Sequence, residues 1–250
     1  MAKISISSSF AYRANFFFNL TISILSNLLV PLVTVLIYRS GAEIPGWAFH
    51  EALLVQASFM LSTGFCAPLF YGMVWTTMGH VKEGTYDLMM IRPGSVIVLT
   101  IAKSFEPENV GVFLGGLVMF IYSIVHVSAA DFISWIQFAI FFLASIALSL
   151  GLTLVMSATA FKWVGNSRIF EMYDSITTFG RYPGTIFSKV MMCITSFVFP
   201  VATLGYLPAA ALLNRSDAVM LLALVPCLAF MAGGVFLFKF MVFKYQSAGG

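Results

Sequence analysis

Apolar runs without a single charged residue alternate along this chain with short polar segments. Each run holds 18 residues or more, and an α-helix needs about 17–25 residues to cross the hydrocarbon core of a bilayer. The pattern therefore predicts six membrane-spanning helices, at residues 16–37, 52–78, 109–126, 132–161, 190–213 and 218–238.

Prolines and glycines modify several of these predicted spans. Pro31 is expected to kink the first span, because proline removes a helical hydrogen bond. Residues 190–213 contain both Pro200 and Pro208, so we expect a crossing followed by a short re-entrant or interfacial piece rather than one straight helix. The third predicted span carries a face of small residues that permits close helix packing: Gly111, Gly115 and Gly116.

Three polar segments contain helical periodicity but too much charge to cross a membrane cheaply. Residues 3–19 place apolar side chains on one face and serines and basic residues on the others, which is typical of a helix lying along a membrane surface. Segments 95–108 and 162–189 contain the same amphipathic pattern. We expect all three to be interfacial rather than spanning.

Composition agrees with a membrane protein and excludes an ordinary soluble domain. The chain is 60% hydrophobic, only 9% charged and has a mean hydropathy of +0.96, whereas soluble domains are about 25% charged. No room remains for a sizeable water-soluble catalytic domain. Cys66, Cys193 and Cys227 lie singly in apolar runs, which favours small buried side chains over a metal site or a disulfide.

The distribution of Lys and Arg predicts the orientation. With the N-terminus in the cytoplasm, eleven of these residues fall in predicted inside segments and two, Arg39 and Arg215, fall outside. Cytoplasmic segments of membrane proteins are enriched in Lys and Arg, so both termini and the loops 79–108 and 162–189 are expected on that side. The predicted fold is an all-α membrane protein, a single transmembrane domain over residues 1–250, with six spans and amphipathic interfacial helices at the cytoplasmic face.

The net charge of +3 then reflects this topology and requires no nucleic-acid partner. The lipid bilayer is the partner that composition itself demands.

The polar stretch at residues 79–93 is the first candidate functional site. It combines charges of both signs with apolar residues and ends at a helix-breaking Arg-Pro pair. Such a mixture suits contact with a groove on a soluble partner, and the alternative is a solvated loop whose charges only enforce topology. The candidate contact residues are Lys82, Glu83, Tyr86, Asp87 and Arg92.

The chain lacks the motifs of an enzyme. No GxxxxGK[ST] phosphate-binding loop is present, and no set of nucleophile, base or metal ligands is visible, so no catalytic or metal residues are assigned. No acid or base lies firmly inside predicted spans one, two, four or six, which weighs against an ion-coupled carrier without excluding it.

Several segments together resemble a branch of the type-2 ABC transporter permeases, among the bacterial export permeases. They are the Gly84-x-x-Asp87 segment ending in Arg92-Pro93, the Phe179-Gly180-Arg181-Tyr182-Pro183 segment, Phe199-Pro200-Val201-Ala202 and Tyr206-Leu207-Pro208-Ala209. The resemblance covers roughly residues 10–245.

This resemblance implies a membrane subunit that pairs with a second permease, the same or a different chain, above two ATPase subunits. ATP and Mg would then bind to those partners, with no cofactor in this chain. It further implies coupling through the 79–93 loop, outward transport and a place in the bacterial cytoplasmic membrane.

Arg181 and Tyr182 are a second candidate site with two interpretations. They would form a cytoplasmic gate or contact the partner permease, or else serve as an interfacial cation and aromatic that anchor the chain. Two other functions stay open for the whole chain: an ion-coupled secondary carrier and a non-transporting structural subunit of a membrane complex.

Overall fold

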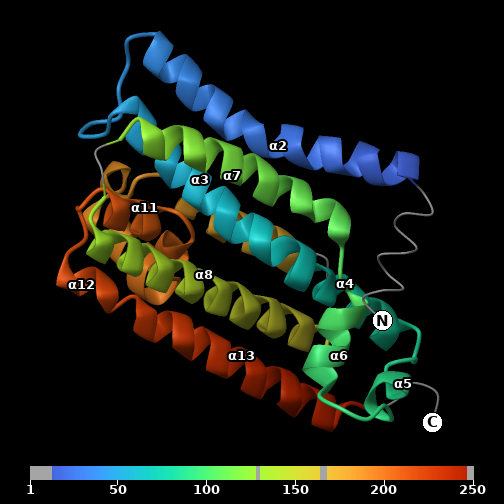
Figure 1. The fold of residues 1–250 in the computed structure, drawn as a ribbon. Helices are drawn as coiled ribbons and strands as arrows, with labels where there is room; N and C mark the ends of the chain where they lie inside the picture. The colour runs from blue at the N-terminus through green and yellow to red at the C-terminus, as the bar shows by residue number, and fades with distance from the viewer. Residues whose placement is uncertain (1–12, 128–129, 164–167, 247–250) are drawn as a thin grey trace.

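The computed structural model describes residues 13–127, 130–163 and 168–246, with side chains from Phe17 onward. In this part of the chain every regular element is helical, and Figure 1 shows the long helices packed side by side. The long elements are α2 (Arg13–Arg39), α3 (Phe49–Cys66) continued by η1 (Ala67–Tyr71) and α4 (Gly72–Lys82), α7 (Val110–Val125), α8 (Phe132–Thr159) and α13 (Leu224–Lys244).

Among the described residues, five helices are long and apolar enough to cross a membrane. They are Phe17–Arg39, Phe49–Lys82, Pro107–Val125, Phe132–Thr159 and Ala218–Lys244. These five match the predicted first, second, third, fourth and sixth spans, and the all-helical fold class is confirmed for the described chain. The predicted fifth span, 190–213, is not among them.

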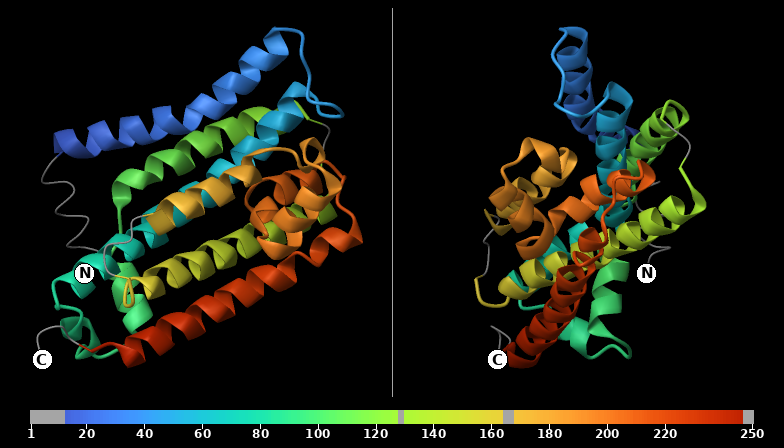
Figure 2. Two further views of the ribbon diagram at one scale, coloured as in Figure 1. Left: turned by 180° about the vertical axis from the view of Figure 1, so that it is seen from behind. Right: turned by 90° about the vertical axis from the view of Figure 1, so that its left-hand side faces the viewer.

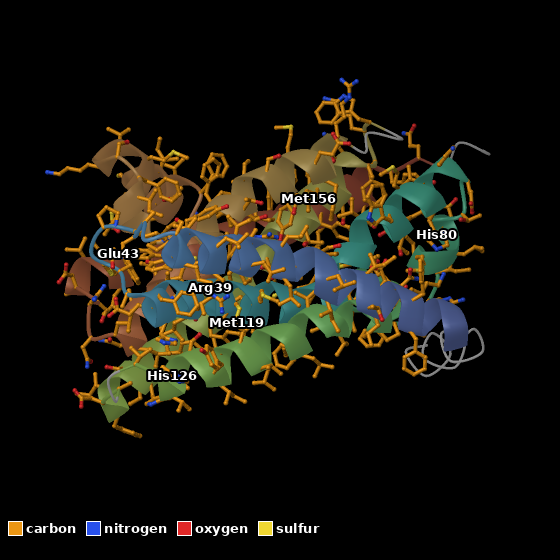
Figure 3. All side chains as sticks on the ribbon, turned by 90° about the horizontal axis from the view of Figure 1, so that it is seen from above. Arg39, Glu43, His80, Met119, His126 and Met156 are labelled. Atoms are coloured by element: carbon orange, nitrogen blue, oxygen red, sulfur yellow. The ribbon has the colours of Figure 1, made fainter. Side chains whose placement is uncertain are left out.

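The bundle has two distinct ends. One end, called here the proximal end, holds the start of α2, the short helices α5 (Asp87–Met90) and α6 (Val96–Lys103), and the end of α13. The opposite, distal end holds the turns at 40–48 and 213–217. Figure 3 shows His80 at the proximal end, and Glu43 and His126 at the distal end.

Two helix pairs approach so closely that only glycine fits between them. In the α3–α7 pair, a Cβ added at Gly64 would collide with the Phe113 backbone, and one at Gly116 would collide with Met60 and Leu61. In the α8–α13 pair, Gly151 and Gly234 lie directly against each other's helix backbone. Such contacts hold helices together in lipid, where no hydrophobic driving force acts between them.

Residues 162–189 do not form the surface loop that the sequence predicts. Instead α9 (Arg168–Thr177) and η3 (Thr178–Arg181) run lengthwise between the two ends, as Figure 2 shows. Tyr173 contacts α3–α4 through a hydrogen bond from its hydroxyl to that of Tyr71, at 2.9 Å. Farther along, Trp47 Nε1 in the distal turn donates to Thr185 Oγ1 at 2.7 Å. The amphipathic pattern correctly predicted a helix. Of its apolar face, Tyr173 is buried against other helices, whereas Met172 and Phe179 remain exposed.

Residues 190–213 form a hairpin that enters the bundle from the distal end and returns to it. The descending arm is α10 (Lys189–Cys193) with η5 (Ile194–Val198), and the ascending arm is η6 (Val201–Leu204) with α11 (Tyr206–Leu212). Lys189 shares a pocket with Asp217 at the distal end, whereas Val201 and Leu204 pack in mid-bundle against Phe59. Residues 190–213 are therefore broken rather than one straight helix, as expected, and α9–η3 runs lengthwise between the two ends.

The predicted interfacial helices have mixed outcomes. Residues 3–12 of the 3–19 segment lie outside the described residues, and 13–19 belong to α2. Segment 95–108 is α6 followed by the short turn η2 (Pro107–Asn109), next to α5 at the proximal end.

Adjacent glycines in α13 provide a test of the α8–α13 contact. Gly234→Ala should cost about 1–3 kcal/mol of stability, because the new methyl group collides with the Gly151 backbone. Gly233→Ala should be neutral or slightly stabilising, because nothing lies within 4 Å of its added Cβ and alanine favours helix. Thermal unfolding in detergent measures both, and equal melting temperatures for the two variants would contradict this packing.

Candidate functional site

A turn at Gly84 and side-chain contacts of His80 hold the 79–93 loop in a fixed shape. Gly84 ends α4 with a positive φ of 66°, a left-handed conformation that glycine adopts without strain. The His80 ring bridges the two arms, because its Nδ1 lies 2.7 Å from Thr85 Oγ1 and its Nε2 lies 3.3 Å from Lys103 Nζ on α6. The loop is therefore a braced unit rather than a free connection.

Tyr86 is fully buried at the root of this loop, with 0% of its surface exposed. Its ring packs edge-on against Phe161, at 4.8 Å, and against Tyr245, at 5.7 Å. Burial raises the pKa of its phenol to about 12, so it remains neutral. The sequence analysis placed Tyr86 among the contact residues; here it anchors the loop to the ends of α8 and α13 and presents no surface to a partner.

The outer surface of the loop is both apolar and charged. Leu88 is 55% exposed and Ile91 is 78% exposed, one on α5 and the other directly after it. Lys82 and Glu83 are exposed beside them, and Asp87, which begins α5, is half-buried, as is Arg92. The predicted charges thus surround an apolar pair that the sequence analysis did not single out.

Arg181 and Tyr182 lie away from the proximal end. Both are half-buried, and the Arg181 guanidinium lies over the Phe59 ring at 4.8 Å. Phe59 is well inside α3, so Arg181 is at mid-depth in the bundle. The segment α9–η3 thus carries Arg181 away from the end of the bundle that holds the 79–93 loop. The Arg181 Nε is buried and has no hydrogen-bond partner in the described part of the chain.

Arg181 lines a pocket of about 350 Å³ between α2, α3–α4, η2 and α9. We call this space the interhelical pocket. Most of its lining is polar or aromatic, which is unusual for a chain with so few charged residues. Its lining includes Ser23, Asn27, Phe59, Thr63, Tyr71, Trp75, Glu106, Asn109, Phe170, Asp174, Thr177 and Arg181.

Glu106 is positioned in this pocket by an irregular turn of the neighbouring helix. The π-helical turn η1 contains Pro68, whose carbonyl oxygen accepts a hydrogen bond from the Glu106 backbone N–H at 3.0 Å. Gly72 follows, and an added Cβ there would collide with the Ser104 carbonyl and crowd the Glu106 carboxylate. Asn109 Nδ2 donates to the carboxylate at 2.8 Å. Insertions of this kind are often found at functional sites.

The surroundings of Glu106 disfavour the charged form of its carboxyl group. Burial raises its pKa above the ordinary value, the nearby Glu108 charge raises it further, and the hydrogen bond from Asn109 partly opposes them. In the sequence, Glu106 is one of the charges that make segment 95–108 too costly to cross a membrane. That cost marks Glu106 as a candidate functional residue, but Pro68 and Gly72, which position it, lie on a segment distant in sequence.

Comparison with known families identifies the chain. A family model described as ABC-2 family transporter protein matches residues 24–249. The chain belongs to the ABC-2 transporter family. The resemblance drawn from the sequence motifs is thereby confirmed, and this ABC-2 protein is a membrane subunit of an ABC transporter. Searches of curated proteins and of solved structures found no match.

Both features fit an ABC-2 membrane subunit physically. The loop offers a firm surface at one end of the bundle, and the interhelical pocket offers a polar space between its helices. Among the described residues, no group of three or more His, Cys, Asp or Glu side chains is arranged to hold a metal ion.

Stability should depend on pH through Glu106. A carboxyl whose pKa is raised by folding binds its proton more tightly in the folded state than in the unfolded state. Its contribution to the stability of the folded protein is therefore fully present at low pH and is lost as the pH rises through the raised pKa. Glu106→Gln should therefore match the wild type near pH 4 and melt progressively higher than it as pH increases. A melting-temperature difference that stays constant over pH 4–8 would contradict the assigned burial.

Proposed function

We propose that this ABC-2 subunit couples to a separate ATPase subunit through the exposed surface of the 79–93 loop. The observation that carries the proposal is the apolar pair Leu88 and Ile91, exposed at the tip of the loop and surrounded by charges. Large apolar side chains exposed together usually mark an interaction site. A short amphipathic helix fits a groove on a partner through such a pair.

The loop is built to transmit movement. Its arms are α4, which continues α3, and α6, which leads to α7, and the His80 ring bridges them. Tyr86 adds contacts with Phe161 and Tyr245. A displacement of α5 by a partner therefore reaches four of the long helices together, as a rigid lever requires.

The charge distribution supports a cytoplasmic proximal end. Eight of the described Lys and Arg residues lie there and three lie at the distal end, which agrees with the positive-inside rule. The proximal residues are Arg13, Lys82, Arg92, Lys103, Lys162, Arg168, Lys239 and Lys244; the distal residues are Arg39, Lys189 and Arg215. The sequence analysis counted Arg181 and Lys189 among the cytoplasmic Lys and Arg residues. In the structure Arg181 lies between the two ends and Lys189 lies at the distal end, so neither is counted on the cytoplasmic side here.

The complete transporter that we propose contains two membrane subunits, of this chain alone or with a second permease, and two ATPase subunits that bind ATP and Mg. It would reside in the bacterial cytoplasmic membrane with both termini inside, have six crossings with α9–η3 as the fifth, and export its substrate. The family membership supports the ATPase partner in general. Arg181 and Tyr182 would then contribute to the pathway at mid-depth.

Charge inserted into the apolar pair should uncouple the complex. In complexes purified with the native ATPase subunit in mild detergent, Leu88→Glu and Ile91→Glu should each reduce ATPase recovery and activity about tenfold or more, as for a desolvated contact residue. Leu88→Met is the matched control and should retain both. The double change of Asp87 and Arg92 to Ala should reduce coupling less, because partly exposed charges contribute less.

Two results would contradict the proposal. Normal ATPase recovery with both Glu variants would show that the partner binds elsewhere. Recovery of the wild-type chain alone, with substrate movement that follows an ion gradient, would favour the secondary carrier instead.

A further inference from the structure

We propose that the interhelical pocket binds an elongated organic cation, with an ammonium or guanidinium group between Glu106 and Asp174 and a hydrogen-bond acceptor against Arg181. The inference rests on the proposed transport function, because it assigns the substrate class. It is drawn from the charges, aromatic rings and shape of the pocket.

The charged side chains of the pocket form no ion pairs with one another. Glu106, Asp174 and Arg181 all line it, yet among the described residues no ion pair joins them. Asp174 is exposed at the pocket, Glu106 is half-buried, and the buried Nε of Arg181 has no hydrogen-bond partner in the described part of the chain. An unpaired charge is costly where it is buried, as it is for the Nε of Arg181 and in part for Glu106. Their presence around one cavity indicates that a ligand supplies the complementary groups.

The two carboxylates lie at the same level, near the proximal end. Asp174 follows Tyr173, whose hydroxyl bonds to Tyr71, and Glu106 is held beside Pro68 and Gly72 on the same stretch of helix. Two acidic side chains, one from α9 and one from the residue before η2, line this part of the pocket and make it negative, so a cation would be favoured there.

Aromatic rings complete the cation site. Tyr71, Trp75 and Phe170 line the pocket at this level, with Trp75 and Phe170 tilted at 5.5 Å and Tyr71 and Phe170 edge-on at 6.1 Å. Aromatic faces attract organic cations, most strongly when water is excluded. This combination selects an organic cation over a small hydrated metal ion, which prefers an all-oxygen shell.

The other end of the pocket selects a hydrogen-bond acceptor. Arg181 lies seven residues beyond Asp174, about 10 Å farther along the helix axis. Its buried Nε has no acceptor among the described residues, and Asn27 and Thr63 lie in the same pocket. A ligand with a purely hydrocarbon tail would leave this donor unsatisfied, whereas a carbonyl, sulfonyl or carboxylate group would accept from it.

The size of the pocket limits the ligand to a small molecule. Its volume of about 350 Å³ is near the lower end of the range for small-molecule sites. The length is set by the separation between the carboxylates and Arg181. The preferred ligand is therefore slender, with its charged group and its acceptor at opposite ends.

Dansylcadaverine is a suitable probe, because an ammonium group and a fluorescent sulfonamide stand at the two ends of a flexible chain. Its binding to the full chain in lipid nanodiscs is measured by fluorescence anisotropy, without an ATPase subunit. We expect saturable binding, about tenfold tighter than that of the N-acetylated, neutral analogue. The absence of saturable binding, or equal affinities for the two probes, would overturn the proposal.

Variants locate the site. Asp174→Asn and Glu106→Gln should each weaken the cationic probe about fivefold or more and leave the acetylated probe nearly unchanged. Glu171→Gln is the matched control, because Glu171 is exposed on the same helix and does not line the pocket. Arg181→Gln should weaken both probes, since both carry the sulfonyl acceptor. Equal losses in the Glu171 and Asp174 variants would overturn the assignment.

The two proposals fail separately. Selective binding that is lost in Asp174→Asn, together with normal ATPase recovery in the Leu88 and Ile91 variants, would retain the pocket and reject the coupling surface. Uncoupling by those variants without selective binding would retain the coupling surface and reject the pocket. Melting temperatures of all variants verify that each is folded.

Discussion

Close contact at glycine is the constraint on which this structure depends. Because lipid removes the hydrophobic driving force between helices, association requires backbones that fit against each other. Gly64 and Gly116 join α3 to α7, and Gly151 and Gly234 join α8 to α13. These two helix pairs are the most closely packed parts of the bundle.

The interhelical pocket lies along one edge of the α3–α7 pair, where α2 and α9 cover it from two sides. One wall of the pocket is therefore a closely packed helix pair, and the other walls are two less tightly packed helices.

The sequence predicted the spans well wherever hydropathy alone decides. Five charge-free runs correspond to the five long apolar helices, within the usual uncertainty of helix ends. The lengthwise packing of α9–η3 among the other helices was not predictable. An amphipathic helix that lines a polar cavity has the same periodicity as one lying on a membrane surface. The contacts that decide between them, Tyr173 with Tyr71 and Arg181 with Phe59, join residues more than 100 positions apart.

The candidate sites were predictable only in part. Charge and the Arg92-Pro93 break drew attention to the 79–93 loop, but α5 is only four residues long, too short for periodicity to show that Tyr86 is buried while Leu88 and Ile91 are exposed. Glu106 was visible as a costly charge. Its place in a pocket depends on the π-helical turn at Pro68, which frees a carbonyl for a residue 38 positions later, and no sequence pattern encodes that pairing.

The 79–93 loop and the interhelical pocket are connected through one contact, between Gly72 and the Ser104–Glu106 segment. The arms of the loop, α4 and α6, diverge at the tip but meet again where Gly72 packs against Ser104 and Glu106. A displacement of α5 that changes the angle between the arms must change this contact, and with it the position of the Glu106 carboxylate. Coupling of this kind is reciprocal: a cation that fixes Glu106 also fixes the arms. In the transporter that we propose, a movement of α5 driven by the ATPase would therefore alter the polar pocket and its affinity for a ligand.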